Sequence, residues 1–167
     1  VDNGVKTPTY RQQQAAQTRE RIADAAQRLF AEHGYTATSI ESIAAAAGVA
    51  VRTVYSAFGA KREILSAICE RWLDRAGARE LAQRTMAITD PALRLRGAAH
   101  WLRTLYEAGF DVVTVLDGAM GEDEQTRELL RAKLAGRNGV MDMFIASLAA
   151  ELVVALPDAQ AIYRAFA

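Results

Sequence analysis

Glycines divide the first 62 residues into short segments with helical periodicity. Gly34, Gly48 and Gly59 each follow a run in which apolar residues recur every three or four positions, the spacing of a helix with one buried face. A glycine just past the last turn is a common helix stop, because it readily adopts the left-handed conformation found there. The helices predicted in this way are Thr18–His33, Ile40–Ala47 and Val51–Phe58, followed by a long fourth helix from Lys61.

The remaining residues continue the helical pattern, and no run alternates apolar and polar residues over the length of a strand. An acidic run suits a helix N-terminus, where the backbone dipole is positive, and proline suits the first turn. Further helices are predicted from Asp90-Pro91 to Gly109, over the shorter apolar segment Phe110–Met120, from the acidic run 122–124 to about Leu156, and after Pro157-Asp158. The chain is therefore predicted to be all-α.

Composition excludes several classes of protein. A chain of 167 residues with 51% hydrophobic and 24% charged residues can bury a core and is not disordered. A single cysteine forms no internal disulfide, and no Cys/His cluster has metal-binding spacing. No apolar stretch is long enough to span a bilayer, and no secretory leader opens the chain. We therefore expect a soluble, cytoplasmic protein without metal or cofactor.

The net charge of zero conceals an asymmetry between the two parts of the chain. Residues 1–62 contain eight basic and five acidic residues, so the remainder carries twelve basic and fifteen acidic residues. A modestly basic N-terminal part on an acidic body is compatible with a DNA-reading domain attached to a partner-binding domain.

The short helices Ile40–Ala47 and Val51–Phe58 have the spacing of a helix-turn-helix motif, whose second helix enters the DNA major groove. Such a helix buries one face and presents the other to the bases. The residues predicted on the exposed face are Arg52, Thr53, Tyr55 and Ser56, none of them acidic. Lys61 begins the next helix, where a positive side chain and free backbone N–H groups together favour a phosphate.

Three spaced motifs run through Arg19–Leu65: LFAEHGY, then T-x-I-x-x-I-A-x-x-A-G-V, then T-V-Y-x-x-F-x-x-K-x-x-I-L. In this order they resemble the N-terminal domain of the TetR family of bacterial transcriptional regulators. The resemblance covers 47 of the 167 residues, and the part after Leu65 matches only in length, helicity and position.

The resemblance implies a ligand-responsive regulator without catalytic activity, a repressor that binds a palindromic double-stranded DNA operator as a homodimer and is released by a small-molecule effector. Residues 1–17 are polar, contain Pro8 and are predicted to form a flexible arm. The three-helix DNA-binding domain then covers 18–62, and a helical-bundle domain for effector binding and dimerisation covers 63–167.

The resemblance also assigns roles to individual residues. It places Thr38 and Ser39 near the DNA backbone, although both hydroxyls also suit capping of the second helix. It places Arg52, Thr53, Tyr55 and Ser56 on the groove-facing side and Lys61 on a phosphate, with Arg52 the candidate for reading a guanine edge. Ala57 departs from the family pattern, which often has His or Tyr there. That phosphate contact is therefore missing or supplied elsewhere, for example by Lys6 and Arg11 of the arm.

Apolar side chains of the second domain are candidates for an effector pocket, although each of them also fits an ordinary core. They are Trp72, Trp101, Leu105, Tyr106, Phe110, Val113, Met120, Met141 and Phe144. A pocket with this lining would take an apolar or aromatic effector. The family commonly dimerises through its last two helices, for which the candidates are Leu148, Leu152, Ile162 and Phe166. Since the chain stops early in that region, we expect the C-terminal part of the domain to be missing.

Two other interpretations remain open. A helical sensor or interaction module without operator binding would fit the zero net charge and Ala57. An enzyme is disfavoured, since no nucleophile, acid–base or phosphate-loop constellation is present. His33 is predicted to be structural, and His100 is predicted to lie on a solvent or partner surface. Cys69 is predicted to be a small buried hydrophobe.

Overall fold

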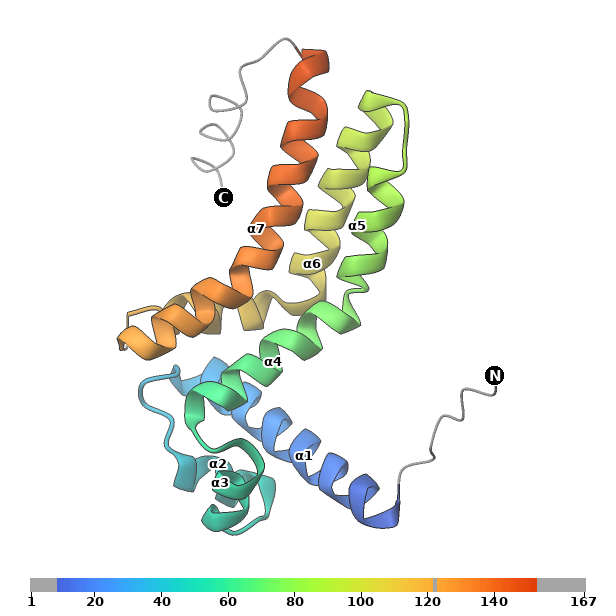
Figure 1. Cartoon of the computed structure of the whole chain (residues 1–167). Coiled ribbons are helices and arrows are strands. Elements are labelled where there is room, and N and C mark those ends of the chain that lie inside the picture. The colour runs from blue at the N-terminus through green and yellow to red at the C-terminus, as the bar shows by residue number, and fades with distance from the viewer. Residues whose placement is uncertain (1–8, 122, 153–167) are drawn as a thin grey trace.

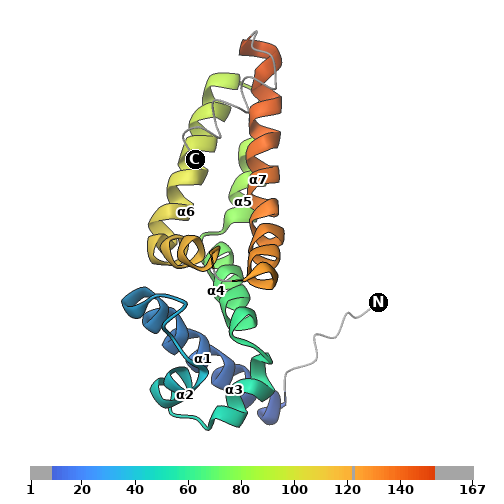
Figure 2. The same ribbon diagram turned by 90° about the vertical axis from the view of Figure 1, so that its left-hand side faces the viewer.

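The computed structural model describes residues 9–121 and 123–152. The helices in this part of the chain are α1 (Tyr10–His33), α2 (Ile40–Ala47), α3 (Val51–Phe58), α4 (Lys61–Arg75), α5 (Ala78–Met86), α6 (Pro91–Ala119) and α7 (Glu124–Leu152). Within the described ranges there is no strand, and the all-α prediction is confirmed. We refer to α1–α3 as the head and to α5–α7 as the body; α4 connects them at the centre of the molecule (Figures 1 and 2).

Helix α1 is longer than predicted, because it begins at Tyr10 and not at Thr18. Thr9 caps it by a reciprocal pair of bonds: its hydroxyl accepts from the Gln12 N–H, and the Gln12 side chain accepts from the Thr9 N–H at 2.8 Å. No glycine or proline follows before Thr18, so this cap starts a helix that nothing interrupts. The prediction of a flexible arm over 1–17 was therefore wrong for residues 10–17, and residues 1–8 lie outside the described part.

Helices α2 and α3 begin and end at the predicted residues. Ser39 caps α2, since its hydroxyl accepts a hydrogen bond from the Ser42 N–H at 3.1 Å. Gly48 ends α2 in the left-handed conformation, with φ of 64°. These local signals are strong enough that neighbouring helices do not displace the boundaries.

The core of the head is made by apolar side chains from all three of its helices and from the first half of α4. Its most deeply buried members include Ile22, Ala26, Phe30, Ile43, Val54, Ile64, Leu65 and Ile68. The same helix α4 packs on α1 at one end and on α6 and α7 at the other. It therefore links the head to the body, beside a direct contact of α1 with α6 in which the Gln27 amide donates to the Asp111 carboxylate at 2.7 Å.

The predicted fourth helix is interrupted at Gly77, where φ is 56°, and α5 forms separately after it. The Ala78 carbonyl at the start of α5 accepts a hydrogen bond from the Trp101 indole N–H at 2.7 Å. Gly77 is a helix stop of the same kind as Gly48, although no break was predicted there. The contact from Trp101, more than twenty positions away, is not visible in the local pattern. The start of α6 was predicted correctly, with Asp90 as the cap and Pro91 in the first turn.

Helix α6 is broken at Gly109, as the sequence indicated, with φ of −175° and ψ of 55°. The Trp72 ring lies in the notch, and a Cβ at position 109 would stand only 2.4 Å from its Cδ1 atom. The Trp72 indole N–H donates to the Leu105 carbonyl at 2.7 Å. In an unbroken helix that carbonyl would accept from the N–H of residue 109, so the indole from α4 replaces a helical hydrogen bond.

Helix α7 follows the acidic run as predicted, and Asp123 accepts hydrogen bonds at 2.8 Å from the backbone and the hydroxyl of Thr126. In the body core, the rings of Trp101 and Phe144 meet edge to face with centroids 5.8 Å apart. The helix predicted after Pro157 lies outside the described residues. Among the helices that are described, none combines the length and the apolar character needed to cross a membrane.

Candidate nucleic-acid interface

Helix α3 separates its side chains cleanly between an apolar and a polar face. Val54 and Phe58 are buried against the head, with 1% and 8% of their surface exposed. Tyr55 is half exposed on the other side. Arg52 and Ser56 are exposed beside it, and Thr53 is partly buried. The predicted face is therefore contiguous and open, which is the geometry that a groove-reading helix needs.

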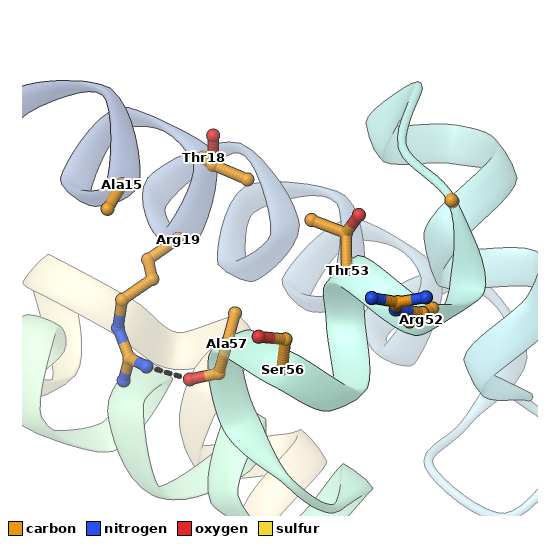
Figure 3. Close-up of a pocket in the computed structure, with 8 residues that line it drawn as sticks. Ala15, Thr18, Arg19, Arg52, Thr53, Ser56 and Ala57 are labelled. Carbon is orange, nitrogen blue, oxygen red and sulfur yellow. Dashed lines mark hydrogen bonds between the residues drawn. The ribbon is translucent and has the colours of Figure 1, made fainter. Parts of the chain in front are cut away.

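A shallow groove of about 620 Å³ lies between the exposed side of α3 and the N-terminal half of α1. Its lining consists of Ala15, Thr18, Arg19, Ala50, Arg52, Thr53, Ser56 and Ala57. Figure 3 shows the Arg19 side chain reaching from α1 to the end of α3. The second wall of this groove is therefore formed by Thr18 and Arg19, which lie in the predicted part of α1, together with Ala15 from its extension.

Two arginines of α1 contact the ends of the helix-turn-helix pair. The Arg19 guanidinium donates to the Ala57 carbonyl in the last turn of α3 and lies 4.1 Å from the centroid of the Phe58 ring. The Arg21 guanidinium donates to the Ala47 carbonyl at the end of α2, at 2.6 Å. Sequence reasoning missed both contacts, because nothing in the local pattern shows which helix an exposed arginine will reach.

Thr38 does not have the position expected for a hydroxyl that contacts DNA. Only 3% of its surface is exposed, and its hydroxyl donates to the Gly34 carbonyl at 2.8 Å. Its hydroxyl also lies 3.2 Å from the Leu29 carbonyl, so it closes the end of α1 and the turn that follows inside the head, and it is not the cap of α2. Ser39 is exposed, but its hydroxyl is engaged as the α2 cap.

Lys61 is also turned inward. Its ammonium group donates to the Tyr35 carbonyl at 2.9 Å and to the Thr38 carbonyl at 3.2 Å, and it lies 4.1 Å from the centroid of the Tyr35 ring. These contacts tie the start of α4 to the turn before α2. The predicted phosphate contact would require the side chain to leave them, so the structure favours an internal role.

The helix-turn-helix segment of this chain is similar to segments of known proteins. Residues 22–68 match the family described as bacterial regulatory proteins, tetR family. A segment of 65 residues is 37% identical to the HTH-type transcriptional repressor ComR of Escherichia coli (strain K12), covering 39% of this chain and 31% of that protein. A segment of 84 residues is 38% identical to the HTH-type transcriptional regulator AcrR of Shigella flexneri, covering 50% of this chain and 39% of that protein.

Over residues 22–68, the N-terminal domain of this chain is similar to the TetR family. The matched segments span between 31% and 39% of the length of these two relatives. One of these relatives is named as a transcriptional repressor and the other as a transcriptional regulator. The fold resembles that of the TetR family transcriptional regulator PfmR from Thermus thermophilus, with a TM-score of 0.69 and 22% identity over 93% of this chain and 81% of that one.

The body contains a second and larger cavity of about 1020 Å³. Its lining comes from α4, α5, α6 and α7: Glu70, Leu73, Asp74, Gly77, Ala78, Arg79, Glu80, Ala82, Gln83, Met86, Trp101, Lys133, Gly136, Val140 and Met143. Lys133 of α7 and Glu70 of α4 form an ion pair at this cavity. Within the described residues, no cluster of His, Cys, Asp and Glu has the composition of a metal site.

Most of the predicted pocket residues lie elsewhere, and only Trp101 lines the cavity. Trp72, Leu105, Met141 and Phe144 are buried in the core, as the alternative interpretation had it. Phe110, which directly follows the break at Gly109, is 69% exposed. The partly buried residues Tyr106, Val113 and Met120 also lie outside the lining.

The predicted dimer residues are only partly within the described chain. Leu148 is 5% exposed in the single chain, so its side chain packs inside its own subunit and is not a surface group. The side chain of Leu152 and all of Ile162 and Phe166 lie outside the described part. Among the remaining side-chain predictions, Cys69 is buried and His100 is exposed, as expected. His33, predicted to be structural, is exposed in the last turn of α1.

Proposed function

We propose that this chain is a DNA-binding transcriptional regulator that reads the major groove with α3. The observation that carries the proposal is the open polar face of Arg52, Tyr55 and Ser56, set opposite the buried Val54 and Phe58. Both curated relatives are named as transcriptional regulators. An eight-residue helix with its side chains fits a major groove about 12 Å wide.

The side chains of α3 divide naturally between reading and positioning. Arg52 has the fork of donors that suits the O6 and N7 atoms of guanine, and Tyr55, Thr53 and Ser56 supply contacts to bases or phosphates beside it. We assign Thr38 and Lys61 to the interior of the head, because their polar groups already have partners there. Ser39 lies at the exposed start of α2, where backbone N–H groups favour a phosphate.

The proposed regulator is a homodimer that binds a palindromic operator in the cytoplasm and represses transcription. A two-fold axis would place two copies of α3 about one DNA turn apart, roughly 34–36 Å. The family resemblance supports this arrangement, and the predicted interface residues Ile162 and Phe166 lie outside the described part of the chain.

We further propose that the body cavity holds a small apolar effector. Leu73, Met86, Trp101, Val140 and Met143 provide apolar lining, and charged side chains surround them. Helix α4 runs from this cavity to Lys61 in the head, so a ligand that favours another placement of α4 changes the spacing of the two α3 helices. By linkage, it then weakens operator binding by its differential affinity for the two states.

Selection of bound sequences from a random pool of duplex DNA tests the DNA-binding proposal. We expect a palindrome, with affinity that falls steeply as salt rises. Arg52→Ala should relax the preference at one base pair of each half-site, at a cost of about 1–3 kcal/mol. Arg28→Ala is the control, since it removes an exposed charge from α1. No enrichment, with a flat salt response, would instead support a sensor or interaction module without operator binding.

The effector proposal has a separate test with the apolar fluorophore 1-anilinonaphthalene-8-sulfonate. Val140→Trp fills the cavity and should abolish fluorophore binding while operator affinity in its absence stays unchanged. In the unsubstituted protein, bound fluorophore should weaken operator affinity. If the fluorophore binds the cavity and the operator affinity does not move, the coupling through α4 is wrong.

A further inference from the structure

Helix α3 has few contacts of its own to hold it in place. It contains eight residues, and only Val54 and Phe58 are buried. Neither Ala50 nor Gly59, the residues that flank it, provides a side-chain cap. A helix this short is not stable by itself, so its orientation depends on what the rest of the head supplies.

Arg19 of α1 supplies three kinds of contact at the C-terminal end of α3. Its guanidinium donates to the carbonyl of Ala57, which lies in the last turn, where carbonyls lack a partner within the helix. The positive charge stands at the negative end of the helix dipole. The planar group also lies over the Phe58 ring, 4.1 Å from its centroid, and a guanidinium can stack there while it donates.

We propose that Arg19 is a positioning residue for the recognition helix: it sets the angle of α3 in the groove without itself contacting DNA. The proposal rests on the DNA-binding function above and deepens it. Arg21, two residues further along α1, makes the corresponding contact with the end of α2 at the Ala47 carbonyl. The helix-turn-helix pair is therefore held from outside by two arginines of one helix.

Arg19 also lines the groove beside Arg52, and its side chain is exposed. The alternative role for it is therefore a direct contact with a DNA phosphate. A phosphate contact and a positioning contact differ in their salt response. Loss of one phosphate contact weakens binding to every duplex and lowers the slope of log affinity against log salt by about 0.9. A misplaced α3 weakens binding to the selected operator and leaves the affinity and slope on random duplex unchanged.

Amide hydrogen exchange of the free protein is the first test. Arg19→Gln keeps the length and polarity of the side chain and removes its charge and its forked donors. We expect the amides of α3 to exchange about tenfold faster, the effect of losing one charge-assisted hydrogen bond, while those of α7 keep their rates. Unchanged α3 rates, or faster exchange throughout the chain, would overturn the proposal.

DNA affinity is the second test, with Arg28→Gln as a charge-matched control on the exposed side of α1. Arg19→Gln should bind the selected operator about fivefold to tenfold more weakly, with the random-duplex slope intact. Arg19→Lys, which keeps one charged donor, should recover part of the affinity. An equal loss of affinity for operator and random duplex, with a reduced salt slope, would identify a phosphate contact. Unchanged affinity for both would mean that Arg19 has no role in binding. Either result contradicts the proposal.

The two tests keep the positioning role separate from the proposed function. If the unsubstituted chain binds no duplex in a salt-dependent way, the DNA-binding proposal fails, and the exchange rates of α3 still decide whether Arg19 holds the helix. If it binds DNA and Arg19→Gln changes neither the exchange of α3 nor the operator affinity, only the positioning role fails.

Discussion

The head and the body place their candidate functional side chains on opposite sides of their helices. In the head, Arg52 and Tyr55 point outward, and the interior is apolar scaffold. In the body, the cavity lies among the helices, and its lining is gathered from α4, α5, α6 and α7. Helical periodicity identifies an outward face directly. It does not distinguish a side chain that lines a cavity from one that fills a core, because both point inward.

The two regions also differ in how their helix ends are set. In the head, Ser39 and Gly48 define α2 through contacts within a few residues. In the body, the indoles of Trp72 and Trp101 bond to carbonyls of distant segments at the break in α6 and at the start of α5. Substitutions that separate local from long-range contacts can therefore test the comparison.

The largest effect is expected at Gly109, where a long-range contact occupies the space of a side chain. A Cβ there would meet the buried Trp72 ring at 2.4 Å, so Gly109→Ala should destabilise the protein by about 1–3 kcal/mol. Gly118 lies in the same helix with open space around it, and Gly118→Ala should be neutral or stabilise by up to about 1 kcal/mol. Denaturant unfolding measures both. Equal costs would mean that the tight packing on Trp72 does not constrain α6.

A comparably large effect on stability is expected at Thr38, whose side chain is buried inside the head. Thr38→Val removes the hydroxyl that donates to the Gly34 carbonyl, which should cost about 1–3 kcal/mol because the site is buried. Ser39→Ala removes only an exposed cap and should cost about 1 kcal/mol. Thermal unfolding of the two variants side by side gives the order. A stability loss that is larger for Ser39→Ala would reverse the roles given to these neighbours.

A smaller effect is expected at Lys61, the first residue of α4. Lys61→Met keeps the stem of the side chain and removes the hydrogen bonds to the Tyr35 and Thr38 carbonyls, so we expect a stability loss of about 1 kcal/mol. The salt dependence of binding to random duplex should not change. A slope lower by about 0.9 at unchanged stability would show that Lys61 leaves the head to contact a phosphate.

The smallest effect is expected at Asp123, which marks a locally determined helix start in the body. A hydrogen bond from the Thr126 N–H, with a second from its hydroxyl, lowers the pKa of the Asp123 carboxyl. Its ionised form therefore stabilises the fold above the pKa of an unfolded aspartate, about 3.9, and this contribution is lost as pH falls through the lower folded value. Asp123→Asn keeps an acceptor oxygen and should flatten the acid side of the melting-temperature profile. Identical profiles between about pH 5 and 2 would contradict the assignment.

The sequence predicted the head far better than the body, for reasons visible in particular residues. The boundaries of α2 and α3, the cap at Ser39 and the exposed face around Tyr55 all follow from short-range pattern. The extension of α1 to Tyr10 was missed because its polar residues show no buried face, although the Thr9–Gln12 cap was there to be read. The inward turn of Lys61 could not be read, since its partners lie 26 and 23 positions earlier in the chain.

By itself, the order of amino acids determined the helical class, the helix-turn-helix pair and the side of α3 that faces outward. Each of these depends on spacing within one or two turns, where the geometry of the helix leaves little choice. Only the tertiary structure decided that Trp101 and Val140 border a cavity while Phe144 fills the core, and that Arg19 reaches the end of α3. These outcomes depend on how distant helices are rotated and stacked on one another, and helical periodicity carries no information about that.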